Sequence, residues 1–126
     1  MANAQIILRE KIAGLGAEAD VVSSPALSPD QTTVYVGSHD GHLYALDAAT
    51  GALRWKRALD VVWSSPAVDA AGQIYVGAWD GKLYALSPTG EVRWTVATGA
   101  PIWSSPALAP GRLYIGSNDG HVYAIE

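Results

Sequence analysis

Three histidines are the residues of this sequence best suited to metal binding. His39 and His42 flank one Asp-Gly pair, and His121 takes the place of His42 beside a later Asp-Gly pair. Imidazole nitrogens are common ligands of zinc and related ions, so three histidines near one rim are a candidate transition-metal site. The corresponding positions of the intervening segment hold Trp79 and Lys82, which breaks the ligand set. We therefore predict no metal site.

Carboxylates and hydroxyls offer the other candidate chemistry. Asp40, Asp80 and Asp119 could serve acid–base catalysis, but each directly precedes a glycine. Because the Asp-Gly pair is a strong turn signal, these aspartates are predicted to form turns. The recurring Ser-Ser pairs have no histidine at a fixed spacing to activate them, and the chain has no cysteine. The sequence therefore predicts a protein that is not an enzyme and binds no cofactor.

The spacing of these residues shows that the chain repeats. A Ser-Ser-Pro-Ala segment begins at Ser23, Ser64 and Ser104, and a longer segment begins at Tyr35, Tyr75 and Tyr114. The period is about 40 residues, which is the length of one four-stranded propeller blade. The composition agrees, because 13 Gly, 5 Trp and 6 Tyr with no Phe favour short strands and tight turns.

Four strands are predicted for each complete copy. In the first copy, Val34–Ser38 and His42–Asp47 are strands joined by the Asp-Gly turn, and Leu53–Ala58 is the outer strand. The outer strand of the second copy is expected over Val92–Thr98. The Ser-Ser-Pro-Ala segment is predicted to be the short inner strand, because proline is tolerated in an edge strand.

The predicted fold is all-β: four-stranded antiparallel propeller blades, three to the chain, in a single half-propeller over residues 1–126. The blades are expected at 20–59, 60–98 and 99–126, the last without its outer strand. Residues 5–19 are predicted to be a displaced outer strand and linker, because Gln5–Ile12 lies where an outer strand belongs. The alternative is an N-terminal helix from Ala4 to Glu18.

One motif carries a family resemblance. Ala45, Asp47, Thr50, Gly51 and Trp55 follow the pattern A-x-D-x-x-T-G-x-x-x-W. This pattern resembles the tryptophan-docking motif of quinoprotein dehydrogenases and of related outer-membrane-assembly lipoproteins. The resemblance implies that the tryptophan slots between neighbouring blades and that the alanine faces its ring.

The second copy keeps part of the same motif, at Ala85, Gly90 and Trp94. The resemblance implies the same docking role for Trp94 as for the tryptophan of the first copy. Enzymes of this family bind pyrroloquinoline quinone and calcium within eight blades. Fold does not carry function, so we expect the blade motif without the cofactor.

A possible binding surface is predicted where two kinds of loop meet. Loops from outer to inner strands and hairpins between the middle strands emerge on the same face of a propeller. This face would gather Trp63, Trp79, Trp103, His39, His42 and His121. Exposed aromatic and polar side chains together are typical of a binding surface. The alternative for Trp63 and Trp103 is packing between blades, whereas Trp79 has no aromatic counterpart and is expected to be exposed.

Three blades do not close a ring, since propellers hold about four to eight. We expect a homodimer with six blades, in which Gln5–Ile12 of each chain completes the last blade of the other. A nine-bladed homotrimer is the second candidate. The net charge of −4 and pI near 5.2 argue against nucleic acid and membrane partners.

The predicted function is a non-catalytic scaffold that self-associates and binds a peptide or small ligand on its loops. One alternative is an excised or designed fragment whose only property is assembly. Another is the remnant of a quinone-dependent dehydrogenase. As written, the sequence is expected to be cytoplasmic, with an extracytoplasmic origin if a leader was removed.

Overall fold

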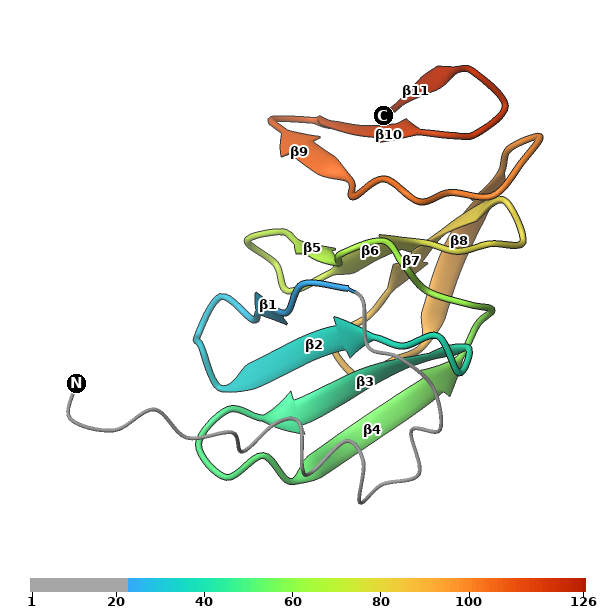
Figure 1. Cartoon of the computed structure of the whole chain (residues 1–126). Helices are drawn as coiled ribbons and strands as arrows, with labels where there is room; N and C mark the ends of the chain where they lie inside the picture. The colour runs from blue at the N-terminus through green and yellow to red at the C-terminus, as the bar shows by residue number, and fades with distance from the viewer. Residues whose placement is uncertain (1–22) are drawn as a thin grey trace, which may run out of the picture.

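Three antiparallel β-sheets stacked in chain order make up the computed structural model, which describes residues 23–126 (Figure 1). The first sheet contains β1 (Ala26–Leu27), β2 (Thr33–Gly37), β3 (His42–Asp47) and β4 (Leu53–Ala58). The second contains β5 (Ala67–Val68), β6 (Ile74–Gly77), β7 (Lys82–Leu86) and β8 (Val92–Ala97). The third contains β9 (Ala107–Ala109), β10 (Arg112–Gly116) and β11 (Val122–Ile125). Each sheet is one blade of the predicted all-β propeller fold.

Tight turns at the Asp-Gly pairs set the register of the two central strands in each blade. Gly41, Gly81 and Gly120 adopt φ angles of 91°, 83° and 89°, a left-handed conformation that glycine adopts without strain. In the first blade the turn places Val36 opposite Tyr44. In this blade the strands predicted on either side of the turn are confirmed to within one residue.

The inner strand is shorter than predicted. Pairing with the next strand begins at Ala26, after the Ser-Ser-Pro residues. Proline has no N–H to donate to a strand pair. The two serines before it bond instead to their own blade or to the neighbouring blade: Ser23 Oγ accepts from Gly37 N–H, and Ser24 N–H donates to Ser65. Only the residues after the proline are therefore available for the sheet.

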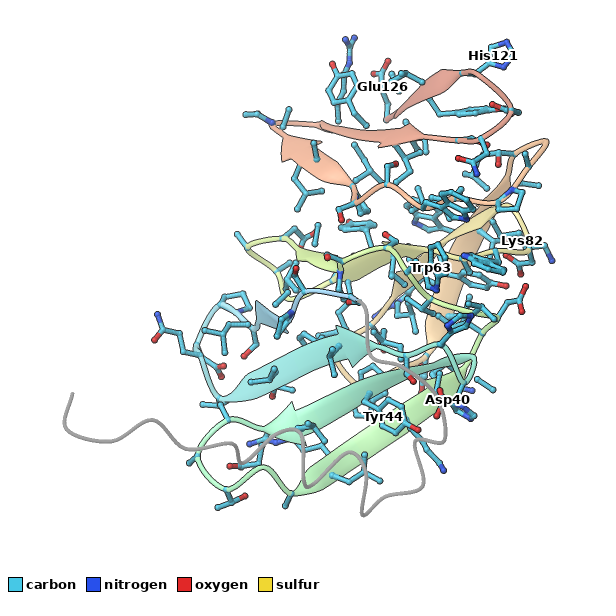
Figure 2. All side chains as sticks on the ribbon, viewed as in Figure 1. Asp40, Tyr44, Trp63, Lys82, His121 and Glu126 are labelled. Carbon is cyan, nitrogen blue, oxygen red and sulfur yellow. The ribbon has the colours of Figure 1, made fainter. Side chains whose placement is uncertain are left out.

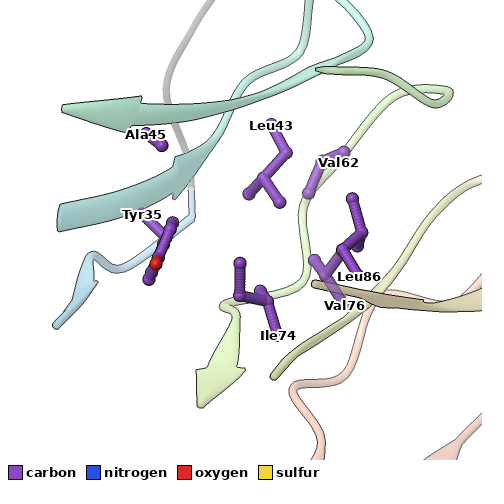
Figure 3. Close-up of a cluster of buried hydrophobic side chains, with 7 residues drawn as sticks. All are labelled: Tyr35, Leu43, Ala45, Val62, Ile74, Val76 and Leu86. Atoms are coloured by element: carbon purple, nitrogen blue, oxygen red, sulfur yellow. The ribbon is translucent and has the colours of Figure 1, made fainter. Parts of the chain in front are cut away.

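Apolar side chains fill the space between successive sheets. Figure 3 shows the cluster between the first two blades, formed by Tyr35, Leu43, Ala45, Val62, Ile74, Val76 and Leu86. A second cluster between the next two blades contains Leu83, Ile102, Leu113 and Ile115. Each cluster combines strand residues of two blades with one residue of the connector between them. The connectors are therefore part of the core.

The predicted strand at Gln5–Ile12 and the alternative helix at Ala4–Glu18 lie outside the described residues. Within the part of the chain that the structure covers, we find no helical segment with the length and apolar character that a bilayer crossing needs.

Candidate functional site

Hairpins and blade-to-blade connectors meet on one side of the molecule, which we call the loop face. It consists of the hairpins at 38–42, 78–82 and 117–121 and the connectors at 59–66 and 98–106. Backbone bonds fix connector to hairpin: the Val62 N–H donates to the Ser38 carbonyl over 3.2 Å, and the Trp79 N–H donates to the Val61 carbonyl over 3.0 Å. Figure 2 shows the labelled Asp40, Trp63, Lys82 and His121 along this side.

Four rings form an aromatic cluster on the loop face: His39, Trp63, Trp79 and Trp103. The centroid of the Trp63 ring lies 4.5 Å from that of Trp79, 5.1 Å from that of Trp103 and 5.4 Å from that of His39. Trp79 also lies 5.4 Å from His39 and 6.0 Å from Trp103. These separations, with tilted or edge-on rings, are those of favourable aromatic pairs. Trp63 thus contacts the hairpins of the first and second blades.

The members of the aromatic cluster differ in exposure. Trp103 is 49% exposed and presents a ring to solvent. Trp79 is half-buried, and its indole N–H and that of Trp63 are buried without an acceptor among residues 23–126. The expectation that Trp79 is an exposed ring is therefore wrong. Its neighbours come from connectors distant in sequence, so the contact forms only in the folded chain.

Replacing Trp79 by alanine is expected to lower the free energy of unfolding by about 1–3 kcal/mol, because three ring contacts are lost. Trp103→Ala is the matched control and should cost less, since that ring is half exposed. Urea denaturation followed by circular dichroism gives both values. A Trp79→Ala protein as stable as the parent would show that this ring contributes nothing to packing.

Each hairpin aspartate stabilises the turn in which it lies through hydrogen bonds. Asp40 accepts a hydrogen bond from the His42 N–H over 3.0 Å and another from the Tyr44 hydroxyl. Asp80 accepts from the Tyr84 hydroxyl in the same way, and the third hairpin repeats the arrangement. Burial, followed by the bond to the Asp40 carboxylate, raises the pKa of Tyr44 above its ordinary value. These carboxylates are engaged in structural bonds rather than directed at a shared point.

The three histidines have separate surroundings. His39 belongs to the aromatic cluster, while the His42 ring lies 5.9 Å from that of Tyr44. The His121 side chain is 75% exposed and its Nδ1 lies 3.3 Å from the Asp119 carboxylate. Across residues 23–126 no three side chains of the His, Asp or Glu type are grouped so that they could hold a metal ion.

The motif tryptophan of the first blade contacts the second blade. Trp55 lies opposite Ala45, which is fully buried, and its Nε1 donates to the Pro88 carbonyl over 3.0 Å. Gly90 lies against the face of the indole, where an added Cβ would meet ring atoms at 2.8 Å. The ring also lies 5.9 Å from Tyr35. The Thr-Gly turn of one blade thus receives the tryptophan of the preceding blade.

Trp94 occupies the equivalent position in the second blade but has a different environment. It lies opposite Ala85 and 5.9 Å from Tyr75, yet it is 38% exposed. It lines a cavity of about 250 Å³ between the second and third blades, together with Leu108 and Ile125. The two motif tryptophans therefore differ in how completely a neighbouring turn covers them.

Asp47 organises the turn before the outer strand of the first blade. Its Oδ1 accepts from the N–H groups of Ala49 and Thr50, both over 2.9 Å. Its Oδ2 accepts from the Arg54 guanidinium over 2.8 Å. The Arg54 bond, followed by the Thr50 N–H, lowers the pKa of Asp47 to about 2. Gly51 completes the turn at a φ of 73°.

The Asp47 turn predicts a specific acid sensitivity. Because the folded pKa lies below the unfolded value of about 4, the stabilisation is present above about pH 4 and is lost as the pH falls through about 2. Asp47→Asn should be less stable near neutral pH and lose less stability than the parent on acidification. Urea unfolding at about pH 7, 4 and 2.5 tests this, with Asp60→Asn as control. Parallel pH profiles for Asp47→Asn and the parent would contradict the assignment.

A family model described as outer membrane protein assembly factor BamB matches residues 13–69 and 61–126. A beta-alanine-activating enzyme of Danio rerio is 46% identical over 55 residues, and Protein Rv3035 of Mycobacterium tuberculosis is 44% identical over 48 residues. These matches cover 41% and 38% of this chain, but 5% and 12% of the relatives. The chain thus spans a small part of the curated relatives it matches.

Solved structures resemble the fold over 86% of this chain. BamB from Moraxella catarrhalis matches with a TM-score of 0.75 at 24% identity, over 38% of that chain. The quinohemoprotein alcohol dehydrogenase ADHIIG from Pseudomonas putida matches with a TM-score of 0.73 at 27% identity, over 19% of that chain. The WD40 repeats of RRP9 match with a TM-score of 0.77 at 15% identity, over 36% of that chain.

Proposed function

This chain belongs to the family of the outer membrane protein assembly factor BamB, and on that basis we propose that it is a non-catalytic β-propeller scaffold. It closes into a ring with a second copy of itself and presents its loop face to a peptide or small ligand. The observation that carries the proposal is the outer edge of β11, which pairs with no strand of residues 23–126. The family is named after an assembly factor, which agrees with a scaffold role.

The edge of β11 differs from the matching edges of the other blades. In those blades the equivalent strands, β3 and β7, pair with outer strands. Ala45 and Ala85 are fully buried there, whereas Ala124 at the same place in β11 is exposed. Val122 is 77% exposed. Strand edges that carry apolar side chains are templates for pairing with another chain, which supports self-association.

The number of blades limits the number of copies. Residues 23–126 of each chain form three sheets, and propellers hold about four to eight blades. Two copies give six blades, within this range, and three copies give nine. We therefore propose a homodimer, with the homotrimer as the second candidate.

Ligand binding is assigned to the aromatic cluster and the hairpins beside it. The exposed Trp103 ring adjoins Trp63 and Trp79, so an apolar or planar group can stack there. The proposal is of binding rather than catalysis because the nearby carboxylates of Asp40 and Asp80 are engaged by tyrosine hydroxyls. A ligand that binds this face should change the tryptophan fluorescence of the parent. The change should be smaller for the Trp103→Ala variant.

The mass in solution tests the ring. Light scattering during gel filtration should give a mass near twice the 13.2 kDa of one chain. Three times that mass would favour the trimer over the dimer and leave the closed ring in place. A stable species at the mass of one chain, unchanged when the protein is concentrated, would overturn the proposal.

A further inference from the structure

We infer that a second copy attaches to the third blade through the same three-part joint that links successive blades within the chain. The inference rests on the proposed self-association and specifies its surface: the hollow over Gly116, the Ser117 carbonyl and the Ser105 N–H. Each part of this joint occurs twice inside the chain and is left open a third time at the last blade.

The first part is an aliphatic side chain held over a glycine. Val62 of the first connector covers Gly37, where an added Cβ would meet Val62 Cγ1 at 2.2 Å. Ile102 of the second connector covers Gly77, where the same contact would be 2.1 Å. Both side chains are fully buried. Val62 belongs to the core cluster of Figure 3, so this contact joins the connector, the end of β2 and the core.

The second part is a backbone hydrogen bond next to that contact. The Val62 N–H donates to the Ser38 carbonyl over 3.2 Å, and the Ile102 N–H donates to the Ala78 carbonyl over 3.0 Å. In the third blade the matching carbonyl is that of Ser117, which accepts from Gly120 inside its own hairpin, as the other two carbonyls do in theirs. A carbonyl oxygen has two lone pairs, so the inter-blade position is open.

The third part is a row of serines that runs from blade to blade. The Ser24 N–H donates to Ser65 Oγ over 2.8 Å, and the Ser65 N–H donates to Ser105 Oγ over 3.0 Å. The row ends at the Ser105 N–H, which has no such acceptor among residues 23–126. At its other end, the Ser24 hydroxyl occupies the accepting position of the row. Within residues 23–126 the serine row of one chain therefore has a free acceptor at its first blade and a free donor at its last blade, and the two groups are complementary.

No side chain of residues 23–126 fills the hollow over Gly116 in the third blade. Among these residues an added Cβ at Gly116 would meet only its own blade, with Ser104 Oγ at 3.4 Å, an ordinary contact distance. Val62 and Ile102 each stand two residues before a Ser-Ser pair. In the first repeat the residue at this position of the sequence is Val21, which lies outside the described residues. The sequence thus supplies an aliphatic residue of the right kind beside the accepting serine. A second copy can offer both to the third blade.

A head-to-tail joint of this kind is the arrangement that closes a ring. Each copy presents one surface at its first blade and the complementary surface at its last blade. Identical copies of this kind form a ring when the rotations from copy to copy add up to a full turn. The two internal joints show that this sequence can make the contact, and the third would repeat it between chains. A second copy is therefore the occupant to which we assign the Gly116 surface.

The variant Gly116→Val tests the joint. A valine should fit the isolated third blade but fill the hollow that the second copy needs, so the folded protein should have the mass of one chain and an association constant at least about tenfold weaker. Arg93→Ala, on the exposed outer strand of the second blade, is the matched control and should associate like the parent. A Gly116→Val protein that associates like the parent overturns this joint and leaves the ring proposal standing. A parent protein that is itself monomeric overturns both.

Cysteine pairing gives a second test that does not depend on valine being tolerated. The chain has no cysteine, so a mixture of Ser24→Cys and Ser105→Cys chains should give a disulfide-linked pair on a non-reducing gel. Neither variant alone should give it. The double variant Ser65→Cys/Ser105→Cys calibrates the geometry, since its disulfide forms within one chain. If that internal bond forms and the mixed chains stay unlinked, the serine row does not continue between copies.

Discussion

Replacing Trp55 by alanine is expected to lower the free energy of unfolding by about 3 kcal/mol, the low end of the range for truncating a packed tryptophan. The ring covers Gly90, and its Nε1 donates to the Pro88 carbonyl over 3.0 Å. The substitution therefore opens a space between two blades and leaves a carbonyl without its donor. Denaturation by urea, followed by far-ultraviolet circular dichroism, measures the loss.

Trp94→Ala is the matched control for this prediction. Motif reasoning alone expects equal losses, but Trp94 is 38% exposed and lines an open cavity. Its truncation should cost clearly less than that of Trp55 in the isolated chain. Equal losses for the two variants would contradict the structural difference between the two positions.

Gly77→Ala is expected to lower the free energy of unfolding by about 2–3 kcal/mol, because a well-packed core does not accept an added methyl group. The new Cβ would lie 2.1 Å from Ile102 Cγ2 and 2.8 Å from Ile102 Cβ, so the connector must move. In the dissociated chain Gly116→Ala is the control, since its Cβ would make only an ordinary contact with Ser104. The urea midpoints of both variants give the comparison.

A double-mutant cycle identifies Ile102 as the residue that the methyl group displaces. Ile102→Ala removes Cγ2, the atom of closest approach. The double variant Gly77→Ala/Ile102→Ala should therefore lose less stability than the two single losses added together, since contacting residues are not additive. Strict additivity would mean that the strain at Gly77 has another source.

Much of the fold is predictable because its signals are local. The Asp-Gly turn at Asp40 fixes which residues of β2 and β3 face each other, and the period of about 40 residues repeats that unit. The inner strand begins later than the sequence predicts, because tolerance of proline in an edge strand does not show where pairing starts. The bonds from the neighbouring serines to Gly37 and Ser65, which remove those serines from the sheet, cannot be read from a strand pattern.

The candidate site is less predictable because it depends on contacts between blades. Sequence patterns place Trp63, Trp79 and Trp103 on one face but do not show that the rings contact one another in tilted and edge-on pairs. The recurrence of glycine at Gly37 and Gly77 was a visible signal of a close approach. Only the structure shows that the approaching residues are Val62 and Ile102.

By itself, then, the sequence determined the blade: its turns, the order of its strands and its threefold repetition, since hydrogen bonds and side-chain alternation over a few residues decide these. The tertiary structure decided what each repeated residue does. Trp55 and Trp94 share one motif, yet only Trp55 meets a turn of the next blade that covers it and accepts its N–H. Burial and hydrogen bonding depend on which neighbour is present, and neighbours in a stack of sheets lie far apart in sequence.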